Sequence, residues 1–308
     1  MVKKKDNLEF IRAMDNRKQI GHSAMRRSFL DAWAKRDSYP VHPVWLITGA
    51  KGIGKATLVY DLIRRMFSDL TGRGVDEIAS QMSSGGIGDL YVIDVEHKHS
   101  TTKSISVDDL REMIGRMQMS SMGESWRVVV IDSMDELSRD APNALLKILE
   151  EPPAKTIFFL IAHSLDRVLP TIRSRARVEK LMPLSPMELR EIGALLLPDK
   201  QITSGLIKIS DGSFGQIAGL LAAGADELFD ESLQTITGAR TNSADLLALA
   251  KKIAKNFESI SVLLNVIHHL KLPDLYSSAI TDIERMRTVN LEPELTVFKI
   301  LTEIKKCS

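Results

Sequence analysis

The sequence predicts a chain of the α/β class with a parallel sheet, followed by two helical regions. Short apolar runs alternate with amphipathic helical patterns over the first 180 residues, as expected of a sheet covered by helices. A glycine-rich loop follows the first apolar run and precedes a helix. After Leu184 the strand signals stop and helical spacing takes over. We therefore expect three domains, over residues 1–182, 183–238 and 239–308.

Five apolar runs bounded by turn residues are the candidate strands. They lie at Val44–Thr48, Leu90–Asp94, Arg127–Ile131, Ile157–Ala162 and Val178–Leu181. Between the second and third runs, Ser106 is placed to cap a helix whose apolar positions recur at helical spacing. Between the third and fourth runs, a second such helix ends before Pro152, because the residue before a proline disfavours helix.

Helix-start signals mark the second half of the chain. Ser185, Pro186 and Glu188 form the pattern of an N-cap, a first-turn proline and a capping-box carboxylate. From Asn242 onward, apolar residues at helical spacing dominate. We expect these stripes to exceed what one small bundle can bury, leaving an exposed apolar patch that needs partner helices.

Composition excludes several classes of protein. Of 308 residues, 44% are hydrophobic and 26% charged, with a net charge of +1, so no global charge attracts the chain to nucleic acid or anionic membrane. The single cysteine, Cys307, excludes a disulfide framework and zinc sites built from several thiolates. No apolar run approaches the roughly 18 residues of a membrane span. We expect a cytoplasmic protein that needs neither metal nor membrane.

The glycine-rich loop has the spacing of a phosphate-binding loop. It reads GAKGIGKAT at 49–57, directly between a strand and an amphipathic helix. Gly49, Gly52 and Gly54 would let backbone N–H groups converge on a phosphate. Lys55 would add a point charge at the helix N-terminus. Spacing, lysine and flanking elements agree, so the sequence predicts P-loop ancestry.

Two groups that ATP hydrolysis needs are missing. Ala56 stands where a Ser or Thr hydroxyl normally binds magnesium, and Thr57 points about 100° away around the helix. Asp132 ends the third strand, as the magnesium-associated aspartate should. Ser133 follows where a carboxylate would orient water, and Asp135 and Glu136 come too late for that place. We therefore expect no hydrolysis.

Several stretches together resemble one family, the clamp-loader AAA+ proteins of bacteria. Besides the loop, they are RVVVIDSMDEL at 127–137, NALLKILEEPP at 143–153 and TIRSRARV at 171–178. The second of these is the most diagnostic, since a plain P-loop occurs in many unrelated NTPases. The resemblance implies a RecA-like AAA+ P-loop domain, a small helical lid and an all-α collar through which five subunits assemble.

The resemblance also implies roles for single residues. Ser174 and Arg175 stand at the family's Ser-Arg-Cys motif, with Ala176 replacing the cysteine. Arg175 is then the arginine-finger candidate for a neighbour's ATP, although a basic turn or a salt-bridge partner is the alternative. Ser164 matches the position that senses the γ-phosphate, or it caps a helix. Gly215 falls where ATP-binding members carry a lid arginine.

The preferred hypothesis is a non-hydrolysing subunit of the bacterial DNA polymerase III clamp loader. It would lend Arg175 to a neighbouring ATPase subunit and help load the sliding clamp onto primed DNA, reaching both through the complex. Its partners would be the gamma/tau and delta subunits. An autonomous AAA+ ATPase and the ATP-hydrolysing gamma/tau subunit are the alternatives. No cofactor is required, and weak ATP binding through the loop stays open.

Overall fold

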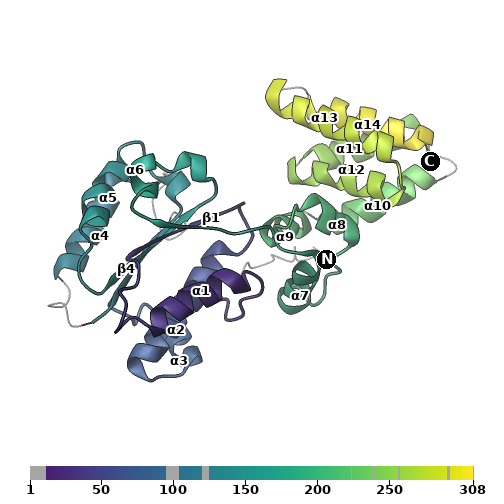
Figure 1. Cartoon of the computed structure of the whole chain (residues 1–308). Helices are drawn as coiled ribbons and strands as arrows, with labels where there is room; N and C mark the ends of the chain where they lie inside the picture. The colour runs from purple at the N-terminus through teal and green to yellow at the C-terminus, as the bar shows by residue number, and fades with distance from the viewer. Residues whose placement is uncertain are drawn as a thin grey trace. The chain divides into compact units, whose positions relative to one another are not determined.

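The chain divides into two compact units. The structure is a computed structural model that describes residues 12–94, 104–119, 125–222, 224–238, 241–255, 257–289 and 292–307. One unit spans Phe10–Leu184 and the other includes Ser185–Ser308. Figure 1 shows both units and labels many of their helices and, in the first unit, strands β1 and β4. The further division of the second unit into a lid and a collar stays a prediction.

The first unit is built on a five-stranded parallel sheet. Its strands are β1 (Val44–Thr48), β2 (Leu90–Asp94), β3 (Arg127–Asp132), β4 (Thr156–Ala162) and β5 (Arg177–Lys180), in the order β2-β3-β4-β1-β5. β1 and β4 are buried along their whole length, and β3 is buried except at its last residue. Burial on both faces is why these strands read as continuous apolar runs. The predicted strands and the α/β class are confirmed, with bounds that shift by at most one residue.

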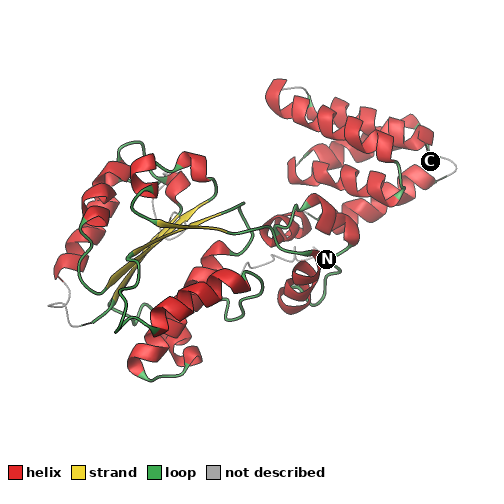
Figure 2. Ribbon diagram, viewed as in Figure 1, coloured by secondary structure: helices red, strands yellow, loops and turns green. Residues whose placement is uncertain are grey.

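Helices cover both faces of this sheet (Figures 1 and 2). One group comprises α1 (Ser23–Ala34), α2 (Lys55–Thr71) and α3 (Val75–Ser83), and the other α4 (Val107–Met119), α5 (Ala141–Glu150) and α6 (Pro170–Arg173). On the first face, the Phe29 ring contacts Trp45 and Phe159 at centroid distances of 4.9 and 5.3 Å. The sheet is therefore the middle layer between two apolar cores.

Local signals start and stop these helices as the sequence predicts. The Ser106 N–H donates to Asp109 Oδ2 over 2.6 Å, and the Asp109 N–H donates to Ser106 Oγ over 3.3 Å. This reciprocal pair is a capping box, with an aspartate in the place of the usual glutamate. α5 ends at Glu150, two residues before Pro152. Both predicted boundaries are confirmed.

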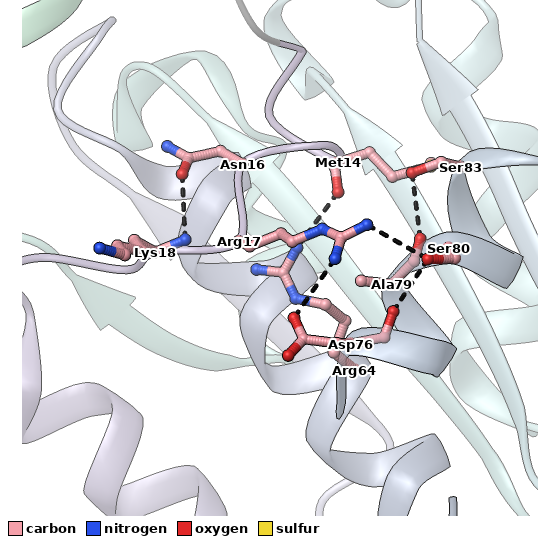
Figure 3. Close-up of polar contacts among 9 residues, drawn as sticks. All are labelled: Met14, Asn16, Arg17, Lys18, Arg64, Asp76, Ala79, Ser80 and Ser83. Atoms are coloured by element: carbon pink, nitrogen blue, oxygen red, sulfur yellow. Dashed lines mark hydrogen bonds and ion pairs between the residues drawn. The ribbon is translucent and has the colours of Figure 1, made fainter. Parts of the chain in front are cut away.

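Two arginines fasten the segment before α1 to α2 and α3 (Figure 3). Arg17 donates to Asp76 Oδ1 over 3.4 Å and to Ser80 Oγ over 3.2 Å. Arg64 is completely buried, and its Nη1 donates to the Met14 carbonyl over 3.1 Å. Burial lowers the pKa of Arg64. Each arginine bridges about 50 or more residues of sequence, so the segment is tied to the body of the unit by non-local contacts.

The described residues of the second unit form helices and connecting turns only. The helices are α7 (Pro186–Leu196), α8 (Ser204–Ile209), α9 (Phe214–Ala222), α10 (Ala225–Thr237), α11 (Ser243–Ala254), α12 (Phe257–His269), α13 (Pro273–Val289) and α14 (Pro293–Cys307). Ser185 and Glu188 form the predicted capping box of α7, and Asn242 with Asp245 forms another at α11. No helix among the described residues is long and apolar enough to cross a membrane.

The described part of the C-terminal helices does not show the expected apolar surplus. α11 packs against α14, and α12 packs against α10, α11 and α13. Among those residues of 241–307 whose side chains the structure describes, the exposed large apolar ones are Leu247 and Leu295, at 37% and 60%. The prediction of a broad exposed patch was wrong, because these helices bury their apolar stripes against one another.

Lys305 has a structural role that its place near the end of the sequence does not suggest. Its Nζ donates to the carbonyl oxygens of Ile236 and Gly238 over 2.6 and 2.8 Å. These carbonyls lie at the C-terminus of α10, where unpaired acceptors and the helix dipole favour a cation. Lys305 on α14 therefore caps α10.

Candidate functional site

The glycine-rich loop connects β1 to α2 at the carboxyl end of the sheet, where α/β sheets bind ligands. Gly49, Gly52 and Gly54 have φ angles of 145°, 80° and 94°, in the region that favours glycine. A Cβ on Gly49 would lie 2.7 Å from the Leu181 carbonyl oxygen. The glycines that the sequence singled out are thus required by backbone geometry and, at Gly49, by close packing.

Lys55 is bound by its own loop. Its Nζ donates to the carbonyl oxygens of Gly49 and Ala50 at 2.7 Å each, and the residue is only 4% exposed. Burial lowers the pKa of Lys55 to about 8, and the nearby carboxylates of Asp132 and Asp135 oppose that shift. The ammonium that would bind a phosphate is therefore hydrogen-bonded to carbonyls of its own loop and lies near two carboxylates of this chain.

The residues around the lysine do not fit a hydrolysing magnesium-ATP site. Ala56 is half-buried at the start of α2 and has no hydroxyl, and Thr57 follows it one helical step later. Asp132 pairs in register with β2 and β4, as the third-strand aspartate should. Ser133 is 1% exposed, and its Oγ has no hydrogen-bond partner. A serine hydroxyl cannot replace the carboxylate that orients an attacking water.

Asp135 has a role that sequence reasoning missed. It lies in the 3₁₀ turn η1 (Met134–Glu136) after β3. Its carboxylate accepts the backbone N–H of His163 over 2.5 Å and that of Ser164 over 3.3 Å. It therefore holds the chain where β4 ends. The only available signal was an acidic residue after one strand and polar residues after the next.

Ser164 contributes its backbone rather than its side chain to this arrangement. The 3₁₀ turn η2 (Leu165–Arg167) begins directly after it, and the Ser164 hydroxyl makes no capping bond to that turn. The helix-cap alternative is therefore wrong. The role of Ser164 in sensing a phosphate stays a prediction.

His163 is a second residue that the sequence did not single out. Its Nδ1 is buried without a partner. Burial and the positive charge of Lys55 lower the pKa of His163 to about 4, against the opposing effect of Asp135. The imidazole is therefore neutral at physiological pH. Lys55, Asp135 and His163 meet at the carboxyl ends of β1, β3 and β4.

Arg175 lies at the surface after α6. Its Nη1 donates to the Thr171 carbonyl over 2.8 Å and to Ser174 Oγ over 3.2 Å, and its Nη2 pairs with Glu150 Oε1 over 2.6 Å. The side chains of Arg175 and Glu150 are 33% and 48% exposed. A surface pair of this kind contributes about 0.2–1 kcal/mol. The salt bridge that one interpretation of Arg175 required is present, and it is weak enough to open.

Gly215 lies in the second unit, within α9, at an exposed position. A glycine cannot supply the guanidinium that the resemblance implies for ATP-binding subunits. No group of three or more His, Cys, Asp or Glu side chains suited to a metal ion occurs among the described residues.

The parallel sheet, the loop at its carboxyl end and the helix that begins at Lys55 define a P-loop protein. The sequence profile of one family, described as DNA polymerase III, delta subunit, matches residues 29–185, which is just over half of the chain. The chain belongs to this family. The resemblance that the motifs indicated is confirmed.

Known relatives of the chain include more than one kind of subunit. It is 30% identical over 176 residues to DNA polymerase III subunit delta-prime of Pseudomonas aeruginosa, covering 55% of this chain and 52% of that protein. It is 33% identical over 146 residues to the Escherichia coli K12 delta-prime subunit, covering 46% and 43%. It is 34% identical over 150 residues to DNA polymerase III subunit gamma of Buchnera aphidicola, covering 47% and 40%. The chain spans about half the length of the curated relatives it matches.

Proposed function

We propose that the chain is a clamp-loader subunit of a bacterial DNA polymerase III, of the delta-prime type. It helps load the sliding clamp onto primed DNA and supplies Arg175 to ATP bound by a neighbouring subunit, without hydrolysing ATP itself. The observation that carries the proposal is the surface position of Arg175, at the family's finger motif, with a single exposed carboxylate as its ion-pair partner. A guanidinium suits this role because it stays charged and donates two parallel hydrogen bonds.

The phosphate loop supports the non-catalytic part of the proposal. Lys55 is bound to its own loop carbonyls, Ala56 lacks the magnesium-binding hydroxyl, and Ser133 lacks a carboxylate. These three features argue against an autonomous ATPase. Similarity to a gamma subunit keeps the ATP-hydrolysing subunit as the second candidate, and the same three features, together with Gly215, speak against it.

The proposed partners are the gamma/tau and delta subunits, with the clamp and primed DNA reached through the complex. We assign residues 239–308 to a collar that joins these partners. Because the described collar helices bury their own apolar stripes, their contact with partners would be a modest surface that includes Leu247 and Leu295. A truncation ending near Gly238 should keep the sheet unit folded yet fail to enter the loader, as measured by size-exclusion chromatography with the partner subunits.

The experiment that tests the finger is Arg175→Ala in a loader reconstituted from its subunits. The variant should fold and assemble, because the residue contributes only surface contacts. Turnover at one neighbouring site should fall on the order of 10³-fold, and clamp loading should fall with it. Arg167→Ala, which removes an exposed arginine of the same segment, is the matched control and should load clamps normally. Clamp loading by Arg175→Ala at the unmodified rate would make Arg175 a structural residue.

A further inference from the structure

We propose that Asp135 is the positioning residue for Arg175. Asp135 holds the start of the segment 163–175, and Arg175 lies at its end. The inference rests on the proposed function, because it concerns how the finger is held. Asp135 itself touches no reacting atom in this scheme, so its effect would pass entirely through the backbone of that segment.

The contact at the start of the segment is strong and comes from a fixed turn. Asp135 accepts two successive backbone N–H groups with its two carboxylate oxygens, and bonds to an ionised acceptor are roughly twice as strong as neutral ones. The turn η1 is itself anchored. The Ile105 N–H donates to the Glu136 carbonyl over 2.8 Å, and the side chain of Met134 is buried in the core. The carboxylate therefore has little freedom to move.

Short hydrogen-bonded turns lead from this contact to the arginine. The Arg167 N–H donates to the Ser164 carbonyl over 3.3 Å, and the Arg175 N–H donates to the Ile172 carbonyl over 3.1 Å. Between them, Val168 and Ile172 are buried at 3% and 0% exposure in the core that α5 also lines. Because the backbone from Ser164 to Arg175 is ordered by these bonds and by core packing, a displacement of the backbone at Ser164 would also displace Arg175.

The far end of the segment is held by the same stretch of chain. Asp135 lies in the turn before α5, and Glu150 is the last residue of α5. Asp135 binds the segment at residues 163 and 164, and Glu150 binds it at Arg175. Glu150 is half exposed, whereas Asp135 faces backbone amides beside the buried loop lysine. Because the Glu150 contact is weak and must open for the finger to act, placement depends on Asp135 at the start of the segment, together with the buried Val168 and Ile172.

The test is a mutant cycle on ATP turnover of the reconstituted loader, stimulated by clamp and primed DNA. The Arg175-dependent turnover is the part that Arg175→Ala removes. Asp135→Ala should lower that part at least about tenfold, since misplacing a catalytic group by about 1 Å can cost about 100-fold. Asp135→Asn keeps one acceptor oxygen and should lose less. In the Arg175→Ala background, Asp135→Ala should remove nothing further, because both act on one function.

Two controls separate positioning from general damage. Glu136→Ala removes the adjacent carboxylate, which makes no bond to the amides of His163 and Ser164, and should leave the Arg175-dependent turnover unchanged. In the isolated chain, hydrogen exchange of the His163 and Ser164 amides should accelerate at least tenfold in Asp135→Asn, while exchange in β3 stays as in the unmodified chain.

The possible results distinguish two failures. If Arg175→Ala leaves loader turnover unchanged, the proposed finger is wrong, and the role of Asp135 falls with it. If Arg175→Ala lowers turnover but Asp135→Ala does not, the finger stands and the positioning role is overturned. If the turnover losses of Asp135→Ala and Arg175→Ala add in the double variant, the positioning role is also overturned, because Asp135 would then act independently of Arg175.

Discussion

Lys55 and Arg175 are two cations of the sheet unit with opposite surroundings. Lys55 is 4% exposed and gives its hydrogen bonds to two carbonyls of its own loop. Arg175 is one-third exposed, and its charge is met by one half-exposed glutamate. On the proposed function, the lysine of the phosphate loop stabilises the fold of this chain. The cation at the surface is the one that can reach another molecule.

The largest expected effect concerns the donor geometry of Arg175, the cation at the surface. Arg175→Lys keeps the charge but loses the planar fork of donors that binds a phosphate through two parallel bonds. We expect it to lower the Arg175-dependent turnover of the reconstituted loader nearly as much as Arg175→Ala, which is on the order of 10³-fold at one site. Full activity of Arg175→Lys would show that only a positive charge is needed at this position. The forked donor geometry would then not be what suits Arg175 to the role.

The next effect concerns the backbone of the glycine-rich loop that contains Lys55. Gly49→Ala should destabilise the chain by about 2–4 kcal/mol, because the new Cβ meets the Leu181 carbonyl and the φ of 145° disfavours a side chain. Gly54→Ala is the matched control, since its φ is also positive but nothing lies within 4 Å of the added carbon. It should cost about 1–2 kcal/mol. Urea unfolding of the two variants measures the difference, and equal losses would contradict the packing argument.

The third effect is a dependence of the free energy of unfolding on pH, which arises from His163 and Lys55. His163 has a folded-state pKa of about 4 against an ordinary 6.5, so the unfolded chain binds more protons between these values and stability rises with pH there. Lys55, at about 8 against 10.5, gives a second rise between pH 8 and 10.5. His163→Asn should flatten only the lower rise. Lys55→Met should remove the upper rise and also reduce the lower one, because the Lys55 charge helps lower the pKa of His163. Unfolding curves across pH 4–11 check both, and unchanged slopes would refute the assignment.

The smallest effect concerns the contact that holds Arg175 at rest. Glu150→Gln removes the charge of its ion-pair partner while keeping an acceptor oxygen. Because exposed pairs contribute little, the free energy of unfolding should fall by less than about 1 kcal/mol. Clamp loading should be retained, since the pair must open for the finger to act. A loss of stability above about 2 kcal/mol would show that Arg175 is held as a structural residue.

Local patterns were enough to predict most of the fold. The strands, the parallel sheet and the capped helices follow from burial on both faces, helical spacing and cap residues, and each of these signals lies within a few neighbouring residues. The loop glycines and Lys55 were found in the same way. The sequence could not show that Lys55 binds its own loop, because that depends on side-chain conformation.

The contacts that sequence reasoning missed join distant residues. Asp135 and His163 are 28 residues apart and meet only because β3 and β4 are neighbours in the sheet. Lys305 reaches Gly238 across 67 residues. The surplus of apolar surface was overestimated for the same reason, since helical spacing identifies an apolar stripe without showing which helix covers it.

On the proposed function, this chain acts through Arg175 and not through its own phosphate loop. The most direct test compares ATP turnover of reconstituted loaders in which this chain carries either Lys55→Ala or Arg175→Ala, with folding and assembly checked for both. We predict that the Lys55→Ala loader turns over ATP at the unmodified rate, whereas the Arg175→Ala loader loses the turnover of one site. Loss of turnover with Lys55→Ala and none with Arg175→Ala would contradict the account.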